Sequence, residues 1–449
     1  MKVKTIKILS GMLAMLAFTA CSSNIDESAD APRFYNVTLT ASMGDADTRA
    51  LSEDDNVITA TFAENDQVVV VDADGSTIVG TLKALSAGES TTLSGTLDAK
   101  TLEVNEVVKL RYRSATANYD AQVGTLAGIA AGQDYAEGTL TVSTLDPLTF
   151  TSNSVTLSAK QSITKFTFKD ASTNAAVSVK TFGIAAAGLV YSIAADATET
   201  TGAVTGTLAT ASSDVYVALR NNTDVKQTYA FTIQDNAGNW YKGTKKAKLI
   251  DGKNYTADVT LTKWIDKDAT LNNQSADGAI GIVNGLPAIA VTINSTKVAV
   301  ALMNVGALCP EAYGTYYTFA NRASGLSNGW YVPTKDELDA LVAIPTKTEL
   351  NANDAKTKEW GAQNGVNGCM FKIEGNKLFL PAAGFIDNDP PLSALFDVST
   401  VGYYWSSTDI DNGATLAYSY RFSASENNTF SEYIANALTV RPFHALPAQ

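Results

Sequence analysis

The sequence predicts a mainly β fold that ends in an α+β domain, and three features lead to this prediction. Short runs of alternating apolar and polar residues, interrupted by Gly, Asp and Asn, extend from about Asn36 to Leu261. Thr, Val, Tyr and Phe suit half-buried strands, while Asp, Asn and Gly suit hairpin turns. No long helical periodicity occurs there. From Pro287 onward, strand-like runs are joined by aromatic loops and one helix signal.

Residues 1–20 have the pattern of a lipoprotein signal peptide. Lysines precede an apolar run over residues 8–18, and small residues lead to Cys21. The run is shorter than the roughly 20 apolar residues that cross a bilayer. Residues 18–21 (FTAC) resemble a bacterial lipobox, which implies that Cys21 is lipidated and contacts outer-membrane lipid. Ordinary cleavage that leaves a free thiol is the alternative.

Residues 21–35 are predicted to form a flexible tether because most of them are small, polar or acidic. In lipoproteins of some Gram-negative envelopes, an acidic stretch just after the cysteine resembles a surface-export signal. We therefore expect the protein to be a surface-exposed lipoprotein of the cell outer membrane, or to lie in a fimbrium.

The formal net charge of −13 argues against nucleic-acid partners, because phosphate contacts need clustered Lys and Arg. Besides Cys21, the cysteines are Cys309 and Cys369, too few for a disulfide framework. They either pair with each other or lie buried as small apolar side chains, and burial is favoured.

The β-rich part is too long for one sandwich of about 100 residues, so we expect two, over residues 36–146 and 147–262. The division is placed at the turn Asp146-Pro147. Residues 263–286 are polar and predict a linker or a long hairpin. Residues 287–449 then form the α+β domain.

The helix of the last domain is predicted to begin at Thr334, whose hydroxyl caps it. Glu337 completes a capping box three residues later. Leu338, Leu341 and Val342 form its apolar face.

Three segments of the N-terminal half carry a family resemblance: Thr48-Arg49-Ala50, residues 62–68 (FAENDQV) and residues 250–261 (IDGKNYTADVTL). They resemble the fimbrillin family, the pilus subunits built from two stacked sandwich domains. The resemblance implies two fimbrillin-like (transthyretin-like) antiparallel β-sandwiches and partners that are other pilus subunits.

The C-terminal half carries a second resemblance, through motifs that occur in order. They are residues 303–307 (MNVGA), 313–317 (YGTYY), 329–338 (GWYVPTKDEL), 378–384 (LFLPAAG), 404–408 (YWSST) and 440–442 (VRP). This series resembles the "major paralogous" surface-lipoprotein domains, which share a C-type-lectin-like core with the formylglycine-generating-enzyme group. The resemblance implies a C-type-lectin-like domain, in which Trp405, Ser406 and Ser407 hold strands and turns together.

No catalytic constellation is expected, and no cofactor. His444 is the single histidine, so any Ser-His or Cys-His mechanism depends on it. Residues 325–329 spell G-x-S-x-G, but that motif needs an apolar strand before it and a helix after it. Polar residues precede it here and an aromatic run follows. The cysteine pair of formylglycine-generating enzymes has no counterpart in spacing.

Acidic loops are weak candidates for a calcium site, because Ca²⁺ prefers carboxylate oxygens. They contain Asp387 and Asp389 in one loop and Asp409 and Asp411 in another. The paired motifs of calcium-dependent lectins are absent, so the ligand stays unidentified.

The resemblances imply a fimbrillin-like surface lipoprotein, a minor (tip or anchor) pilus subunit or adhesin that binds a host or microbial surface ligand. A non-pilus lipoprotein that captures glycans or peptides for nutrient uptake is the alternative, and an envelope hydrolase is disfavoured. In fimbrillins a protease cuts after an arginine at the place of Arg49, so that the chain begins at the residue corresponding to Ala50. Residues 34–41 alternate like a removable edge strand, which a strand from another subunit would replace. Alternatively, Arg49 is a solvated loop residue and the strand stays.

Overall fold

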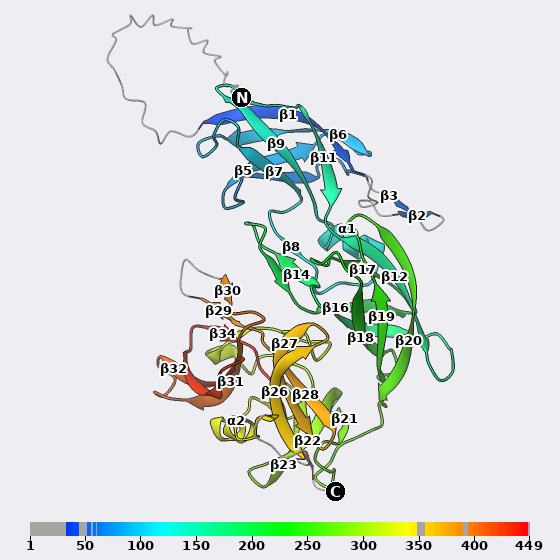
Figure 1. Cartoon of the computed structure of the whole chain (residues 1–449), viewed down its shortest axis with the longest axis vertical. Coiled ribbons are helices and arrows are strands. Elements are labelled where there is room, and N and C mark those ends of the chain that lie inside the picture. Colours follow the sequence, from blue (N-terminus) through cyan, green and yellow to red (C-terminus); the bar gives the residue numbers. More distant parts are fainter. Residues whose placement is uncertain are drawn as a thin grey trace, which may run out of the picture.

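The computed structural model describes residues 33–44, 52–54, 57–59, 61–347, 355–388 and 394–447. Within these ranges almost all regular structure is β-strand, with two short helices, α1 (Leu126–Gly132) and α2 (Lys335–Val342). The prediction of a mainly β chain is therefore confirmed. Three units follow one another along the long axis of the molecule, from β1 at one end to the sheets around α2 at the other (Figure 1).

The first unit is built on one eight-stranded sheet that closes on itself. Its order is β10-β9-β11-β1-β6-β5-β4-β7, and β7 also pairs with β9. The strands are β1 (Phe34–Met43), β4 (Gln67–Val71), β5 (Ile78–Ala84), β6 (Ser90–Asp98), β7 (Val107–Tyr112), β9 (Ala136–Leu145), β10 (Leu148–Phe150) and β11 (Ser154–Ala159). β10 pairs with β9 alone, and the alternating apolar side chains of the sheet fill the interior. A separate hairpin joins β2 (Ser52–Asp54) to β3 (Val57–Thr59).

The first unit continues beyond the expected division at residues 146/147. Asp146-Pro147 is the turn of the β9–β10 hairpin, and β11 pairs with both β9 and β1. The strands over residues 148–159, which we assigned to the second sandwich, thus belong to the first sheet. Their alternation is compatible with either sheet, and only backbone pairing decides between them. The expected tether over residues 21–35 also ends earlier, because β1 begins at Phe34.

The second unit contains a seven-stranded sheet of order β16-β13-β18-β19-β20-β12-β17 and a three-stranded sheet of order β15-β14-β8. The strands are β8 (Ala117–Asn118), β12 (Ser162–Asp170), β13 (Val179–Ala185), β14 (Val190–Ile193), β15 (Glu199–Thr201), β16 (Val204–Ser212), β17 (Asp214–Leu219), β18 (Gln227–Asp235), β19 (Trp240–Ala247) and β20 (Asn254–Ile265). Its first long strand, β12, runs parallel beside its last, β20. In the first unit β1 likewise runs parallel beside β11, so the two units share this unusual pairing.

The connection between β7 and β9 leaves the first unit and enters the second. It supplies β8, which pairs with β14, and α1, which lies against β17. Tyr119 and Ile129 of this connection are buried in the core of the second unit. The first two units are therefore connected in two ways. The segment between β7 and β9 packs into the second unit, and residues 160–161 link β11 to β12.

The third unit has four small sheets around α2. Their orders are β21-β22-β23-β35-β25, β24-β34-β29-β30, β26-β27-β28 and β31-β32-β33. The strands are β21 (Ile280–Val283), β22 (Leu286–Ile293), β23 (Thr296–Ala301), β24 (Tyr317–Thr318), β25 (Trp330–Tyr331), β26 (Lys356–Gln363), β27 (Val366–Ile373), β28 (Asn376–Pro381), β29 (Phe385–Asp387), β30 (Ala394–Phe396), β31 (Gly402–Asp409), β32 (Leu416–Phe422), β33 (Asn427–Tyr433), β34 (Ala437–Leu438) and β35 (Phe443–Ala445). A 3₁₀ turn, Phe319–Asn321, lies between β24 and β25.

The predicted helix is present with the predicted cap. The Thr334 hydroxyl accepts a hydrogen bond from the Glu337 amide, and the Glu337 carboxylate accepts one of 2.8 Å from the Thr334 amide. Leu338 and Leu341 are buried against the core, and Val342 is partly buried beside them.

Residues 263–286, predicted as a linker or a long hairpin, are largely built into the second and third units. β20 continues to Ile265, and β21 forms a hairpin with β22. Leu271 and Val283 are buried in an apolar cluster of the third unit. The expected linker was inferred from polarity, whereas a few apolar side chains are enough to fix this segment.

Candidate functional site

The second and third units meet in a buried apolar seam. Trp240 and Ile265 of the second unit pack into the core around α2. A second cluster joins Ala185 and Ala203 to Cys309, Tyr313 and residues of β27 and β28. The Tyr313 hydroxyl donates a hydrogen bond of 2.7 Å to the Thr201 carbonyl across this seam. These contacts hold the two units in one orientation.

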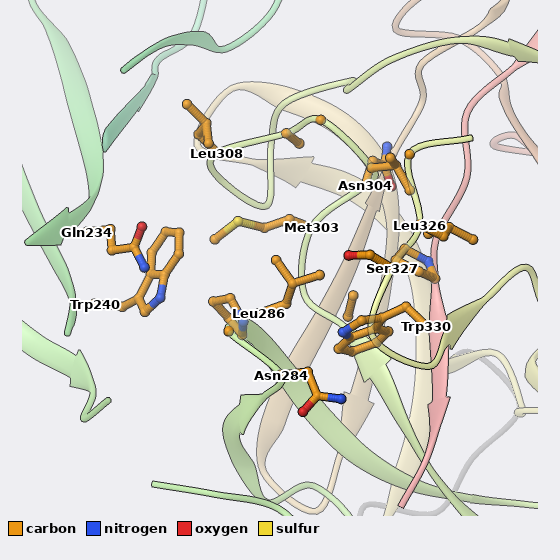
Figure 2. Close-up of a pocket in the computed structure, with 18 residues that line it drawn as sticks. Gln234, Trp240, Asn284, Leu286, Met303, Asn304, Leu308, Leu326, Ser327 and Trp330 are labelled. Carbon is orange, nitrogen blue, oxygen red and sulfur yellow. The ribbon is translucent and has the colours of Figure 1, made fainter. Parts of the chain in front are cut away.

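A cavity of about 260 Å³ lies at this seam, between β18 and β19 of the second unit and the loops of the third (Figure 2). None of its lining side chains carries a charge. The lining consists of Gln234, Trp240, Asn284, Gly285, Leu286, Pro287, Ala301, Met303, Asn304, Val305, Gly306, Ala307, Leu308, Gly325, Leu326, Ser327, Trp330 and Pro442. Figure 2 shows Trp240 on one side and Ser327 and Trp330 on the other, with Leu286 and Met303 between them.

Three buried polar atoms of this lining have no hydrogen-bond partner in the protein: Trp240 Nε1, Trp330 Nε1 and Asn304 Oδ1. The orientation of the Asn304 amide is set by its nitrogen, which donates to the Tyr313 carbonyl at 2.8 Å and to the Tyr404 hydroxyl at 3.2 Å. The Asn304 side-chain oxygen therefore has no hydrogen-bond donor in the protein. All three atoms are shielded from solvent, so they present almost no surface to the cavity.

A second cavity of about 440 Å³ lies on the other side of residues 306–308, which line both. Asp120 and Thr205 lie in its wall, and the Asp120 carboxylate accepts hydrogen bonds of 2.7 Å from the Thr205 amide and hydroxyl. Because these hydrogen bonds come from the protein itself, the Asp120 carboxylate is not left unpaired in the second cavity.

The G-x-S-x-G segment is a loop, as its sequence context predicts, and it does not follow a strand or open a helix. Among the contacts described for the His444 ring, none is to a carboxylate. Its Nδ1 faces the Ala445 carbonyl at 2.6 Å, and its Nε2 faces Asn284 Nδ2 at 3.0 Å and the Asn328 carbonyl at 3.1 Å. Gly325, Leu326 and Ser327 of this loop line the seam cavity, which sequence reasoning missed.

Cys309 and Cys369 are both free and buried, the arrangement that the composition favours over a disulfide. Burial raises the pKa of the Cys309 thiol well above its usual range and that of Cys369 to about 12. A thiol that stays protonated is a poor nucleophile, so neither cysteine is suited to covalent catalysis.

Of the acidic calcium candidates, the structure describes Asp387, Asp409 and Asp411. Within the described residues no group of three or more His, Cys, Asp or Glu side chains is placed to hold a metal ion. Asp411 caps its own turn and accepts hydrogen bonds from the Thr415 and Leu416 amides. Asp387 ends β29 and Asp409 ends β31, and Asp389 lies outside the described residues.

Trp405 joins two strands, and Ser406 and Ser407 make hydrogen bonds within β31 and to a loop. Trp405 is fully buried and its indole nitrogen donates a hydrogen bond of 2.6 Å to the Tyr317 carbonyl. The Ser406 hydroxyl is buried and accepts a hydrogen bond from the Thr408 amide. The Ser407 carbonyl accepts one of 3.1 Å from Arg322.

The lipidation and processing candidates Cys21, Arg49 and Ala50 lie outside the described residues, as does the signal peptide. Neither of the described helices is long and apolar enough to cross a membrane.

β1 is the remaining candidate for an assembly site, and its position differs from the expectation. It pairs with β6 from Phe34 to Ser42, and over residues 40–43 it also pairs with β11. Residues 34–39 pair with β6 alone, as predicted for an edge strand, whereas the prediction is wrong for Thr40 and Ala41, which also pair with β11. Side-chain alternation reports one buried face, and it carries no information about how many backbone partners a strand has.

The side chains of Val37, Leu39 and Ala41 point from β1 into the core, where they are buried. Loss of β1 would leave β6 and part of β11 with unpaired backbone groups and would open an apolar groove between them.

No protein-family model and no curated protein matches this sequence. Several solved structures of adhesion and pilus proteins are similar at low identity. A proposed cell adhesion protein from Bacteroides uniformis is 14% identical, and 51% of this chain and 96% of that chain are covered with a TM-score of 0.30. A fimbrial assembly protein from Parabacteroides distasonis is 11% identical, with coverage of 60% and 94% and a TM-score of 0.26. The shaft pilin SpaA from Lactobacillus rhamnosus GG is 13% identical, with coverage of 51% and 98% and a TM-score of 0.23.

Proposed function

We propose that this chain is a fimbrillin-like surface lipoprotein, a tip or anchor subunit of a pilus or an adhesin, that binds its target through the third unit. The observation that carries the proposal is the position of β1. A first strand that lies partly between two others leaves a two-sided groove when it is removed, and a strand from another subunit can fill that groove.

β1 and a strand from another subunit would bind in the groove through the same interactions. The backbone groups of β6 and β11 need partners, and the apolar groove needs Val37, Leu39 and Ala41 or equivalent side chains. Proteolysis after Arg49 would separate β1 from the rest of the chain. In this proposal the groove becomes the acceptor site for a neighbouring subunit.

A tip or anchor position is favoured over a repeated stalk position by the way β35 is held. Phe443–Ala445 pairs with β23 on one side and β25 on the other. Residues 443–445 are thus committed to the five-stranded sheet and are not free to serve as a donor strand for the next subunit.

Immunogold labelling of intact cells tests the proposal. Label at filament ends or at filament bases is expected for a pilus subunit, and label spread evenly over the cell body without filaments would contradict a position in a pilus. The N-terminus of protein recovered from the surface tests processing. A start at Ala50 supports strand removal, whereas lipidated Cys21 as the sole start leaves an anchored adhesin with β1 in place.

A second function is favoured by one observation, the seam cavity. A lipid-tethered protein that captures glycans or peptides for uptake needs a pocket, and the uncharged cavity between the second and third units, with Asn284 and Ser327 in its lining, offers one. Such a protein would remain monomeric and would co-purify with a transporter.

A further inference from the structure

β33 is an open edge of a sheet on the surface of the third unit. It is the last strand of the sheet β31-β32-β33, and α2 contacts all three strands, so the helix lies across a face of this sheet. The labelled strands of the sheet, β31 and β32, lie at the flank of the third unit that is away from the second unit (Figure 1). Phe430 and Tyr433 of β33 are 44% and 66% exposed, so the strand is accessible.

The pairing of β33 with β32 shows which backbone groups point outward. The Ile434 amide donates a hydrogen bond of 3.1 Å to the Thr415 carbonyl, in the register that β32 and β33 share. Hydrogen-bonded pairs alternate along an antiparallel ladder, so the even-numbered residues of β33 direct their backbone groups toward β32. The backbone groups of Thr429 and Ser431 point away from it, and within the part of the chain that the structure describes they have no hydrogen bond.

The other long edge strands of the second and third units are protected. Within the described residues, each edge strand of six or more residues except β33 has a hydrogen-bond partner on its outer side. The strands are β16, β17, β26, β28 and β31, and their partners are, in that order, the carbonyls of Gln122, Gly124 and Pro345, the guanidinium of Arg441 and the carbonyl of Thr439.

β33 also lacks the sequence features that keep an open edge from pairing. Lys, Pro and β-bulges commonly protect such edges, and β33 contains no Lys or Pro and pairs with β32 without a shift in register. Seven residues of regular strand with outward backbone groups are therefore ready to pair with another strand.

We propose that β33 pairs antiparallel with β33 of a second copy of this chain, so that two three-stranded sheets join into one. The inference goes beyond the proposed function, because it concerns a contact between copies and does not involve the target. The contact is isologous, which means that the same strand forms both sides of it about a two-fold axis.

The outward backbone groups and the length of β33 fix the register. Phe430 is the middle residue of Asn427–Tyr433, so full overlap places it opposite Phe430 of the second copy. Thr429 then lies opposite Ser431 of the second copy, and each such pair exchanges both backbone hydrogen bonds. The two Phe430 residues form a non-hydrogen-bonded pair, in which side chains lie closest, and aromatic pairs are favourable there.

The side chains favour a second copy as the occupant. Glu432 is the one charged residue of β33, and in this register it lies opposite Asn428 of the second copy, whose amide can donate to the carboxylate. Thr429 and Ser431 bring hydroxyl groups together, which is another favourable cross-strand pair. No like charges meet within the two strands, so β33 is complementary to itself.

The test is sedimentation equilibrium of the mature chain with Cys21→Ser, so that no lipid drives association. One strand on each side makes a small interface, and we therefore expect a weak dimer with a Kd of roughly 10–100 µM. Hydrogen exchange at the Thr429 and Ser431 amides should slow as the protein concentration rises through this range, because these amides become paired.

Phe430→Lys places two lysines opposite each other at the axis and should raise the Kd roughly tenfold or more. Phe430→Glu should have the same effect, and an equimolar mixture of the two variants should associate again because opposite charges then meet. Val225→Lys is the matched control. It adds the same charge at an apolar residue of the second unit that is 59% exposed, and it should leave the Kd unchanged.

Ser431→Pro removes an outward amide and keeps the hydrogen bonds to β32, since proline is tolerated where the N–H of an edge strand faces solvent. It should abolish the dimer even if the Phe430 variants fold poorly. A parent chain that stays monomeric up to about 500 µM would overturn the inference and leave this edge to a strand of a different protein. The inference also fails if Phe430→Lys and Ser431→Pro associate as tightly as the parent, or if mixing the folded Lys and Glu variants restores no association.

Discussion

Arg441 Nη2 donates a hydrogen bond of 2.9 Å to the Phe379 carbonyl, and its Nη1 donates one of the same length to the Ala301 carbonyl. The guanidinium is fully buried and joins the end of β23 to β28, which belong to different sheets. Burial lowers the pKa of Arg441 to about 10. Arg441 is thus a structural tie of the third unit and does not face the seam cavity.

Arg441→Ala should destabilise the third unit by about 2–6 kcal/mol, because two buried carbonyls would lose their donors. Urea unfolding followed by tryptophan fluorescence measures this change. Arg421→Ala, on the partly exposed strand β32, is the control and should have a much smaller effect. A stability of Arg441→Ala equal to that of the control would show that water replaces the guanidinium.

Trp405→Ala should destabilise the chain by about 3–5 kcal/mol, since it empties a fully buried site and frees the Tyr317 carbonyl. Trp405→Phe should recover most of the packing and lack the hydrogen bond. Both are measured by the midpoint of urea unfolding. A Trp405→Ala variant of wild-type stability that fails to bind a ligand would instead place Trp405 in a binding site.

The Gln122 side chain, in the connection between β7 and β9, pairs with the backbone of β17 as a neighbouring strand would. Loss of this side chain should weaken the attachment of the connection to the second unit. Its side-chain nitrogen donates to the Ala218 carbonyl at 2.8 Å, and its oxygen accepts from the Ala218 amide at 2.9 Å. Gln122→Leu should therefore speed hydrogen exchange at Ala218 and cost about 2–6 kcal/mol. Unchanged protection of the Ala218 amide would contradict this role.

Asp277 should make stability depend on acid pH. Burial raises the pKa of its carboxyl, but hydrogen bonds from Lys297, Lys356 and Thr292 outweigh this effect and lower the pKa to about 2. Because the pKa in the unfolded chain is about 3.9, the stabilisation is complete above about pH 4 and is lost as the pH falls toward 2.

Asp277→Asn should therefore be less stable than the wild type at pH 7, and the difference should shrink between about pH 4 and pH 2. Urea midpoints of both proteins across this range measure the difference. A difference in stability between the two proteins that stays constant down to pH 2 would show that ionisation of Asp277 does not cause the difference.

Cys21→Ser should release the protein from membranes if Cys21 carries the lipid, as the sequence before it predicts. Fractionation of cells after a carbonate wash measures the release. Cys309→Ser is the control, because Cys309 is buried at the seam and should not alter membrane attachment. Persistent membrane association of Cys21→Ser would place the anchor elsewhere.

Local signals in the sequence determined the features that depend on nearby residues. The capping box of Thr334 and Glu337 placed α2, because a cap and its helix lie within one turn. Alternation of apolar residues predicted that the chain is mainly β, since a strand with one buried face repeats every two residues. The sequence left a disulfide between Cys309 and Cys369 open while favouring burial, and the structure has both thiols free and buried.

Tertiary structure alone decided which strands share a sheet and where cavities lie. Alternation indicates which face of a strand is buried and says nothing about its backbone partners. It therefore did not predict that residues 154–159 belong to the first sheet, or that β1 has a second neighbour there. The tie through Gln122 and the cavity between Trp240 and Trp330 bring together residues far apart in the chain. Such contacts depend on how whole units pack, and no local pattern of residues records that packing.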